Sequence, residues 1–312
     1  MDLTSCNLYG IKDVKTLQQV LGVSLFEYHD DKKIYRKFYS SEILGDSHRL
    51  VEAPCKKLKH IQRRIVDSLL ELDFPDYLLS VKRHSFIDNA IVHSNAKNFI
   101  IKIDISKFFP NTARDKVYKF WKRDMKMSSS VASLMTNLTT VTTGVASEPI
   151  KKFYTDNGII CENHLPTGAP SSSILAYLVN EKMFDEIQQI VKQNNGIMTV
   201  YVDDITISMC NSPTDVFISV RKIIFSNGYR ISNKKSSIKT IHNTVEITGL
   251  VHTRNGQTRL PNRIYKRISE LRNSDDPVEQ EILQGLLQYK RQFEKRVYHK
   301  KSQNEGYQSG ME

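Results

Sequence analysis

The chain has 312 residues, 39% of them hydrophobic and 25% charged, which is ordinary for a globular protein in water. No apolar run approaches the ~20 residues of a membrane-spanning helix, and the first residues lack the basic-then-apolar layout of a secretory signal. Its 45 Lys and Arg exceed its 34 Asp and Glu, and the formal charge of +11 favours a polyanionic partner such as nucleic acid. The four cysteines (Cys6, Cys55, Cys161 and Cys210) show no metal-ligand spacing, so we expect reduced thiols in a cytoplasmic protein.

Short helices and extended segments are expected to alternate at the start of the chain. A helix is expected over 13–28, followed by an extended hairpin over 35–51 with its turn at 45–46. A longer helix follows Pro54, a residue suited to a first helical turn. Apolar residues recur along it at helical spacing and basic residues occupy its other side, so it has a core face and a basic face.

A strand is expected over 99–105, because apolar residues alternate along it. The alternation directs Asp104 away from the side chains of Ile103 and Ile105. Regularly spaced apolar residues then predict three helices, over 129–142, 171–192 and 214–227. A strand near 238–251 and a basic helical tail complete the chain.

Two β-rich runs over 198–208 flank Asp203 and Asp204, the pattern of a hairpin with carboxylates at its turn. With Asp104 they are the candidate catalytic residues. Three mutually repelling acids are held together only around a cation, and their hard oxygen atoms suit Mg²⁺. Two such ions ~4 Å apart can activate an attacking hydroxyl and neutralise a leaving pyrophosphate. The plainer alternative is that the acidic pair is a solvated turn.

Five segments resemble motifs of one enzyme family. The first three resemble motifs of reverse transcriptases, in the expected order and spacing: Asp-Ile-Ser-Lys-Phe-Phe at 104–109, the glycine-containing loop at 165–172, and the Tyr-x-Asp-Asp hairpin at 201–204. Two more resemble signatures of the bacterial retron group: Asn-Ala-x-x-His at 89–93, and Ile-Thr-Gly for the usual Val-Thr-Gly at 247–249. The loop departs from the family pattern, with Thr167 for the usual Gln and Ser173 for the usual Pro, and its contact to template or nucleotide stays open.

The resemblance implies a right-hand polymerase of the α+β class with fingers, palm and thumb, in which an antiparallel palm sheet bears the catalytic Asp residues. We expect an N-terminal helix and fingers over 1–85, and a palm over 86–252 with a fingers insertion around 110–165. The stretch 110–165 includes a polar, loop-rich part after 144. A basic helical thumb and a polar tail are expected over 253–312.

Site residues follow from the resemblance. Two Mg²⁺ ions are expected on Asp104, Asp203, Asp204 and the carbonyl of Ile105. The nucleotide-binding candidates are Phe108, Phe109, Thr167, Gly168, Arg49, Arg63 and Lys234, with Lys235 as the alternative to Lys234. Phe108 is the preferred ring under the incoming sugar, Phe109 is the alternative, and either could be a core residue. The RNA-binding candidates are Asn89, His93, Arg254, Arg259, Arg263, Lys266 and Arg267, with a structural role as the alternative for Asn89 and His93.

The implied reaction is addition of deoxynucleotides to a DNA strand on an RNA template. Retron resemblance further implies a dedicated structured non-coding RNA, priming from its 2′-OH, an RNA-linked single-stranded DNA product, an effector protein encoded nearby and a role in defence against phage. The alternatives are a reverse transcriptase of the group II intron or diversity-generating type, and a non-catalytic subunit that binds structured RNA. An RNA-dependent RNA polymerase is disfavoured by the bulky Phe108-Phe109 pair.

Overall fold

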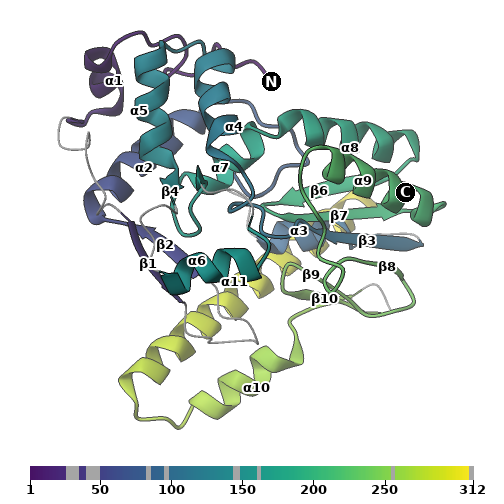
Figure 1. Ribbon diagram of the computed structural model, residues 1–312. Coiled ribbons are helices and arrows are strands. Elements are labelled where there is room, and N and C mark those ends of the chain that lie inside the picture. The colour runs from purple at the N-terminus through teal and green to yellow at the C-terminus, as the bar shows by residue number, and fades with distance from the viewer. Residues whose placement is uncertain are drawn as a thin grey trace.

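A computed structural model describes residues 1–25, 35–39, 50–81, 86–94, 98–142, 148–159, 163–253 and 257–308 (Figure 1). Its centre is a four-stranded antiparallel sheet in the order β6-β7-β3-β8. The strands are β3 (Phe99–Asp104), β6 (Ile197–Tyr201), β7 (Asp204–Met209) and β8 (Ser237–Thr240). The strand expected over 99–105 and the hairpin expected over 198–208 are both confirmed.

Both faces of this sheet are covered. Helices α8 (Glu181–Gln193) and α9 (Pro213–Ser226) lie on one face (Figure 1), where Ile101 and Ile103 of β3 join the larger hydrophobic core. Ile100, on the other face, joins a second core that includes α3 (Phe86–Val92). A strand buried on both sides is fixed in position, so Asp104 at its end is held firmly.

The larger core extends into a set of helices beside one end of the sheet (Figure 1). These are α1 (Val14–Leu21), α2 (Lys56–Leu69), α4 (Arg114–Lys119), the π-helix η2 (Phe120–Asp124), α5 (Ser129–Thr139) and α7 (Ser172–Leu178). In α2 the apolar residues Leu58, Ile61 and Ile65 are buried while Arg63 is exposed, as its two-faced pattern predicts.

Small antiparallel pairs flank these helices. They are β1 (Tyr35–Tyr39) with β2 (Leu50–Pro54), and β4 (Val141–Thr142) with β5 (Asn163–His164). The pairing of β1 with β2 agrees with the expected hairpin, whose predicted turn at 45–46 lies outside the described residues. Helix α6 (Glu148–Asp156) occupies part of the stretch expected to be loop-rich.

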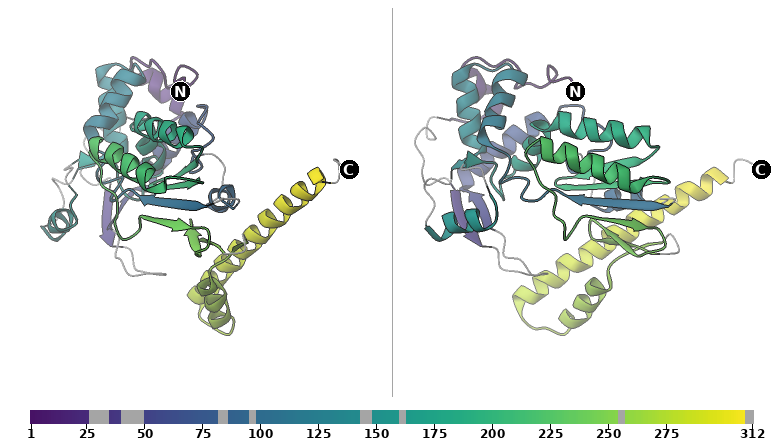
Figure 2. Two further views of the ribbon diagram at one scale, coloured as in Figure 1. Left: turned by 90° about the vertical axis from the view of Figure 1, so that its right-hand side faces the viewer. Right: turned by 45° about the vertical axis from the view of Figure 1, so that its right-hand side comes forward.

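The C-terminal part forms the second core. A three-stranded sheet, β9 (Val245–Ile247), β10 (Leu250–His252) and β11 (Thr258–Arg259), precedes α10 (Asn262–Leu271) and α11 (Pro277–Gln308). Ile264 and Ile268 of α10 and Leu283 and Phe293 of α11 are buried in it. Figure 2 shows α11 as a long rod whose end projects from the rest of the molecule.

Two expected elements are divided. The helix expected over 171–192 breaks at Val179-Asn180, where the Asn180 amide donates to the Ala176 carbonyl (2.8 Å) and to the Tyr229 hydroxyl (2.9 Å). The strand expected over 238–251 is three strands. Thr248 and Gly249 have φ of 42° and 84°, so they make a tight two-residue turn between β9 and β10.

The mixture of helices with antiparallel sheets agrees with the expected α+β class. Among the described residues, no helix is both long and apolar enough to cross a membrane.

Candidate active site

The three candidate carboxylates meet at one end of the central sheet. Asp104 is the last residue of β3, and it pairs in register with Asp204, the first residue of β7. Asp203 lies in the turn before β7, where Val202 has a left-handed φ of 61°. The Ile105 N–H donates to the Asp203 carbonyl at 2.9 Å, so the turn is attached directly to the strand that carries Asp104. Segments 100 residues apart therefore place their acids side by side.

The electrostatics of this cluster are those of crowded negative charge. Burial raises the pKa of Asp203 to about 6, and the neighbouring carboxylates of Asp204 and Asp104 add to the rise. The ammonium of Lys235 partly offsets it. The charged form of such a carboxyl group is stabilised when a cation binds beside it. This is the behaviour of a metal ligand.

A loop after α9 surrounds Asp104, which is 6% exposed. Lys235 Nζ donates to its Oδ2 at 2.9 Å, and its backbone N–H donates to Ser236 Oγ at 3.1 Å. The Ser232 N–H donates to the Asp104 carbonyl at 2.8 Å. Of the two lysines considered for the nucleotide phosphates, Lys234 is exposed and does not line the cavity described below, whereas its alternative Lys235 does.

The donor set suits a divalent ion. Within the described part of the chain, no three His, Cys, Asp or Glu side chains already surround one point as a finished metal cage. The carboxylates of Asp104, Asp203 and Asp204 are nevertheless coupled electrostatically, and hard oxygen atoms are what Mg²⁺ prefers. Because Lys235 is bonded to Asp104, an ion bound there would compete with its ammonium group.

A cavity of about 620 Å³ opens in front of the carboxylates, which is large enough for a nucleotide. Its lining comes from several elements far apart in sequence. It includes Leu50 and Glu52 of β2, Phe108 and Phe109 after β3, Phe153 and Tyr154 of α6, Thr167, and Tyr201 at the end of β6. Residues of β2 and α6 thus form part of the wall of the cavity that also contains the acids.

The two phenylalanines after Asp104 occupy different environments. Phe108 is 4% exposed, and its ring packs against Tyr229 (5.3 Å between centroids) and Phe184 (6.1 Å). Phe109 is half-buried and lines the same cavity. Phe108 is therefore anchored in the core, and the position expected for it under a bound sugar suits Phe109 better.

A buried carboxylate in the cavity lining, Glu52, joins several segments of the wall by hydrogen bonds. It is not among the residues predicted from the sequence. It is 1% exposed and accepts hydrogen bonds from the Tyr154 hydroxyl and from the Thr167 N–H (3.2 Å). His164 Nε2 lies 3.1 Å from Glu52 Oε2, the oxygen that also accepts from the Thr167 N–H, and the Glu52 N–H donates to the Thr167 carbonyl at 2.6 Å. Its signal was present in the sequence, since alternation along β2 places Glu52 on the buried face.

The glycine after Thr167 lies against this network. Gly168 has a φ of 110°, and a Cβ built on it would lie 2.9 Å from Val51 Cγ1. Only glycine accommodates both the backbone conformation and the close approach. Of the two predicted arginines, Arg63 is exposed on α2 and does not line the cavity, while Arg49 lies outside the described residues.

Asn89 and His93 are buried rather than presented to a ligand. His93 Nδ1 lies 3.0 Å from Ser208 Oγ on β7, and its Nε2 lies 2.7 Å from Thr199 Oγ1 on β6. The Asn89 amide donates to Thr248 Oγ1 at 3.3 Å. Both side chains thus join segments within the protein, as expected from their structural alternative, and their burial argues against direct contact with RNA.

The predicted basic residues of the C-terminal part divide by their partners. Arg263 forms a two-pronged ion pair with Glu246, and Arg267 lies 3.4 Å from Glu270 and 3.5 Å from Glu279. Arg259 and Lys266 are exposed; Arg259 donates to Gln257 Oε1, and Lys266 lies 3.9 Å from Glu270. Arg254 lies outside the described residues.

Comparison with known proteins places these features in context. Residues 40–252 match the family model described as "Reverse transcriptase (RNA-dependent DNA polymerase)". The chain is 28% identical to the Retron Ec86 reverse transcriptase of Escherichia coli over 76% of this chain and 67% of that protein. It is 26% identical to the Retron Se72 reverse transcriptase of Salmonella heidelberg, and 22% identical to the Retron Mx162 reverse transcriptase of Myxococcus xanthus. Those alignments cover 69% and 84% of this chain, but only 54% and 58% of the two relatives.

Proposed function

The chain belongs to the reverse transcriptase (RNA-dependent DNA polymerase) family, and from that premise we propose that Asp104, Asp203 and Asp204 catalyse DNA synthesis on an RNA template. The predicted recognition of a retron-type enzyme, and of an RNA-directed DNA polymerase, is confirmed by the family match and the retron relatives. The observation that carries the residue assignment is the register of β3 and β7, which sets Asp104 opposite Asp204. Both carboxylates are close enough to Asp203 to raise its pKa.

In the proposed reaction, a hydroxyl of the primer attacks the α-phosphorus of a deoxynucleoside triphosphate, a new phosphodiester bond forms and pyrophosphate leaves. Two Mg²⁺ ions, when bound, supply the positive charge that activates the hydroxyl and neutralises the leaving group. Asp104 and Asp203 hold this charge in place, Asp204 supports them, and the Ile105 carbonyl completes the ligand set. Lys235, already bonded to Asp104 at 2.9 Å, lies where it can orient a triphosphate.

Different residues of the cavity wall have different roles in the proposed binding of the nucleotide. Phe109 lies under the sugar and excludes a ribose 2′-OH by its bulk. Gly168 allows the backbone to approach the nucleotide closely. The Glu52 network fixes the backbone on both sides of Thr167, so the loop is rigid before the nucleotide arrives.

The proposed subdomains follow the elements. The fingers comprise 1–85 and the insertion around 110–165, the palm comprises 86–252, and the thumb comprises 253–312. In the thumb, α10 and α11 pack into the second apolar core, which they share with α3 and β3. Exposed basic residues such as Arg259 and Lys266 would contact the phosphates of a duplex.

We further propose that the enzyme works on one dedicated structured RNA in the cytoplasm, as both template and primer. Its product would be single-stranded DNA joined to an RNA 2′-OH, and an effector encoded nearby would use the complex in antiphage defence. The retron names of the relatives support this assignment, and the excess of basic over acidic residues suits an RNA partner.

The product decides between this proposal and its rivals. The protein is purified with the RNA transcribed beside its gene and supplied with labelled dNTPs and Mg²⁺. We expect labelled DNA that stays joined to RNA and is released by an enzyme that cleaves 2′–5′ branches. DNA made only from an added primer would indicate a group II intron-like or diversity-generating enzyme. No DNA from either primer would indicate a non-catalytic RNA-binding subunit.

A further inference from the structure

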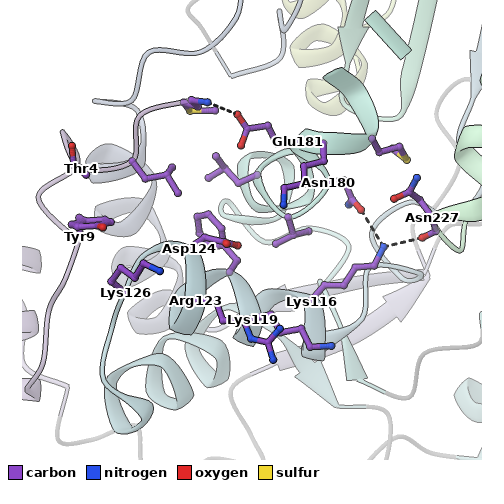
Figure 3. A pocket seen from close by; sticks show the side chains of 17 residues that line it. Thr4, Tyr9, Lys116, Lys119, Arg123, Asp124, Lys126, Asn180, Glu181 and Asn227 are labelled. Atoms are coloured by element: carbon purple, nitrogen blue, oxygen red, sulfur yellow. Dashed lines mark hydrogen bonds and ion pairs between the residues drawn. The ribbon is translucent and has the colours of Figure 1, made fainter. Parts of the chain in front are cut away.

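A second cavity, of about 570 Å³, is separate from the one around Asp203. Figure 3 shows its lining. The N-terminal segment, α4, η2 and the start of α8 enclose it. Within the described parts of the chain, its lining shares no residue with that of the cavity around Asp203. The basic side chains of its lining outnumber the acidic ones: Lys116, Lys119, Arg123, Lys126 and Lys182 against Asp124 and Glu181.

Much of this positive charge is not neutralised by the protein itself. Arg123, Lys126 and Lys182 are exposed, and they form no ion pair with any residue that the structure describes. Of the two acids, Glu181 is paired with the terminal amino group at 2.9 Å (Figure 3). The cavity therefore keeps a positive potential that an anion can use.

The cavity also has apolar and aromatic surface. Phe120, Leu178 and Met183 are buried residues of its lining. The half-buried ring of Tyr9 forms part of its wall, near Lys126 in Figure 3. Basic groups beside an aromatic ring suit a ligand that combines a phosphate with a flat base. This is how proteins hold single-stranded nucleic acid.

The backbone at this cavity is unusual. Residues 120–124 form a π-helix, in which the Met125 N–H donates to the Phe120 carbonyl at 2.9 Å. Lys126 follows with a left-handed φ of 55°. π-Helical turns are rare and occur frequently at functional sites, and a left-handed lysine is uncommon. Arg123 and Lys126 both line the cavity through this local geometry.

We propose that this cavity binds a phosphate and its base from single-stranded RNA outside the polymerase cleft. Arg123, Lys126 and Lys182 hold the phosphate and Tyr9 stacks on the base. The proposal rests on the proposed function only in that RNA is the ligand. It deepens that function by giving the protein a second hold on its RNA, away from the site of synthesis.

The test first occupies the polymerase cleft with nucleic acid and then measures RNA binding at the second cavity. The protein is saturated with an RNA template–DNA primer hybrid, and binding of a fluorescent oligouridine is followed by anisotropy over a range of salt. For Arg123→Glu/Lys126→Glu we expect affinity to fall at least about tenfold and the salt slope by about 0.7, since the one phosphate contact that the cavity makes to a single strand contributes about 0.7. Tyr9→Leu is expected to weaken binding several-fold with an unchanged slope, because it removes stacking alone.

The matched control is Arg221→Glu/Lys222→Glu on α9, which makes the same charge change at exposed residues outside both cavities. Lys116 is left intact because its ammonium also bonds Asn180 and Asn227 at 3.1 and 2.9 Å. Equal oligouridine binding by both double variants would overturn the proposal. Primer extension on the same hybrid reports the proposed function separately, and its failure in the wild type would leave the cavity test readable.

Discussion

The neighbouring residues Phe108 and Phe109 have different environments, and we propose different roles for them. Both side chains line the cavity in front of the carboxylates, but the Phe108 ring is buried against Phe184 and Tyr229, whereas Phe109 is only half-buried. Sequence alone placed Phe108 first, because adjacent identical residues carry no signal of which one the turn after β3 directs inward. Burial distinguishes them.

Phe109→Ala is expected to lower the preference for dNTP over NTP by at least about tenfold, because space opens for a 2′-OH. Phe108→Ala is expected to leave that preference unchanged and to reduce the free energy of unfolding by about 3–5 kcal/mol, because it leaves a cavity in the core. Incorporation of single dNTPs and NTPs, together with denaturant unfolding, checks both expectations. If Phe108→Ala alone relaxed sugar selection, the assignment to Phe109 would be wrong.

The raised pKa of Asp203 predicts a pH dependence of DNA synthesis. Near and below pH 6 this carboxyl group takes up a proton, and a protonated carboxyl group is a poor metal ligand. The rate should therefore fall on acidification below about pH 6. A bound cation favours the charged carboxylate, so the midpoint should move to lower pH as Mg²⁺ is increased. Initial rates between pH 5 and 8 at low and high Mg²⁺ measure this, and a midpoint indifferent to Mg²⁺ speaks against Asp203 as a ligand.

The sequence predicted the acids because their types, order and hairpin context are local features. It could not predict their partners. Lys235 rather than Lys234 reaches Asp104, and this depends on the rotation of the chain in the turn between α9 and β8. Glu52 meets His164 only because β2 and β5 come together in the fold, across 112 residues of chain.

Among the elements, α3 lies behind the β6–β7 hairpin and is joined to both of its strands. His93, just after α3, lies within hydrogen-bond distance of Ser208 on β7 and Thr199 on β6, so one imidazole holds both strands. Burial, with a smaller contribution from the nearby His252, lowers the pKa of His93 to about 3. The ring therefore stays neutral in the folded protein at any pH near neutrality.

The buried, neutral His93 predicts that the free energy of unfolding decreases in acid. The unfolded chain takes up a proton at His93 near pH 6.5, while the folded protein does not until about pH 3. Acidification below pH 6.5 thus favours unfolding, by up to about 1.4 kcal/mol per pH unit from this residue. His93→Gln should lower stability at pH 7.5, by about 1–3 kcal/mol, and flatten its decline between pH 6.5 and 4.5.

Urea unfolding at several pH values compares wild type, His93→Gln and the control His60→Gln, which changes an exposed histidine of α2. The control should keep the slope of the wild type. A His93→Gln protein with the same decline as the wild type would show that His93 is accessible to protons in the folded state.

Element prediction succeeded where periodicity is long and failed where tertiary contacts intervene. The alternation in β3 and the two faces of α2 were readable from the sequence. The break between α7 and α8 was not, because it depends on Asn180 reaching Tyr229, 49 residues away. Helix α11 continues to Gln308, into the stretch that was expected to be a polar tail. Its first half is held by the buried apolar residues Leu283, Leu286 and Phe293.

At the scale of the whole molecule, two hydrophobic cores meet at the strand that ends in Asp104. Ile101 and Ile103 face the larger core, and Ile100 faces the core shared with α3, α10 and α11. The metal site that we propose therefore lies where the C-terminal helices and the main body support the same strand. Charge repulsion among the acids can be tolerated there because packing fixes the backbone from both sides.

The central claim is that the three converging carboxylates perform nucleotide addition, and Asp203→Asn tests it most directly. The rate of a single dNTP addition is measured on a prebound RNA template–DNA primer, beside the matched control Asp215→Asn at an exposed position of α9. We expect a loss of about a thousandfold for Asp203→Asn, since metal charge contributes several kcal/mol to such a step, with primer–template affinity and the control rate near those of the wild type. An Asp203→Asn rate within about tenfold of the wild type would contradict the account.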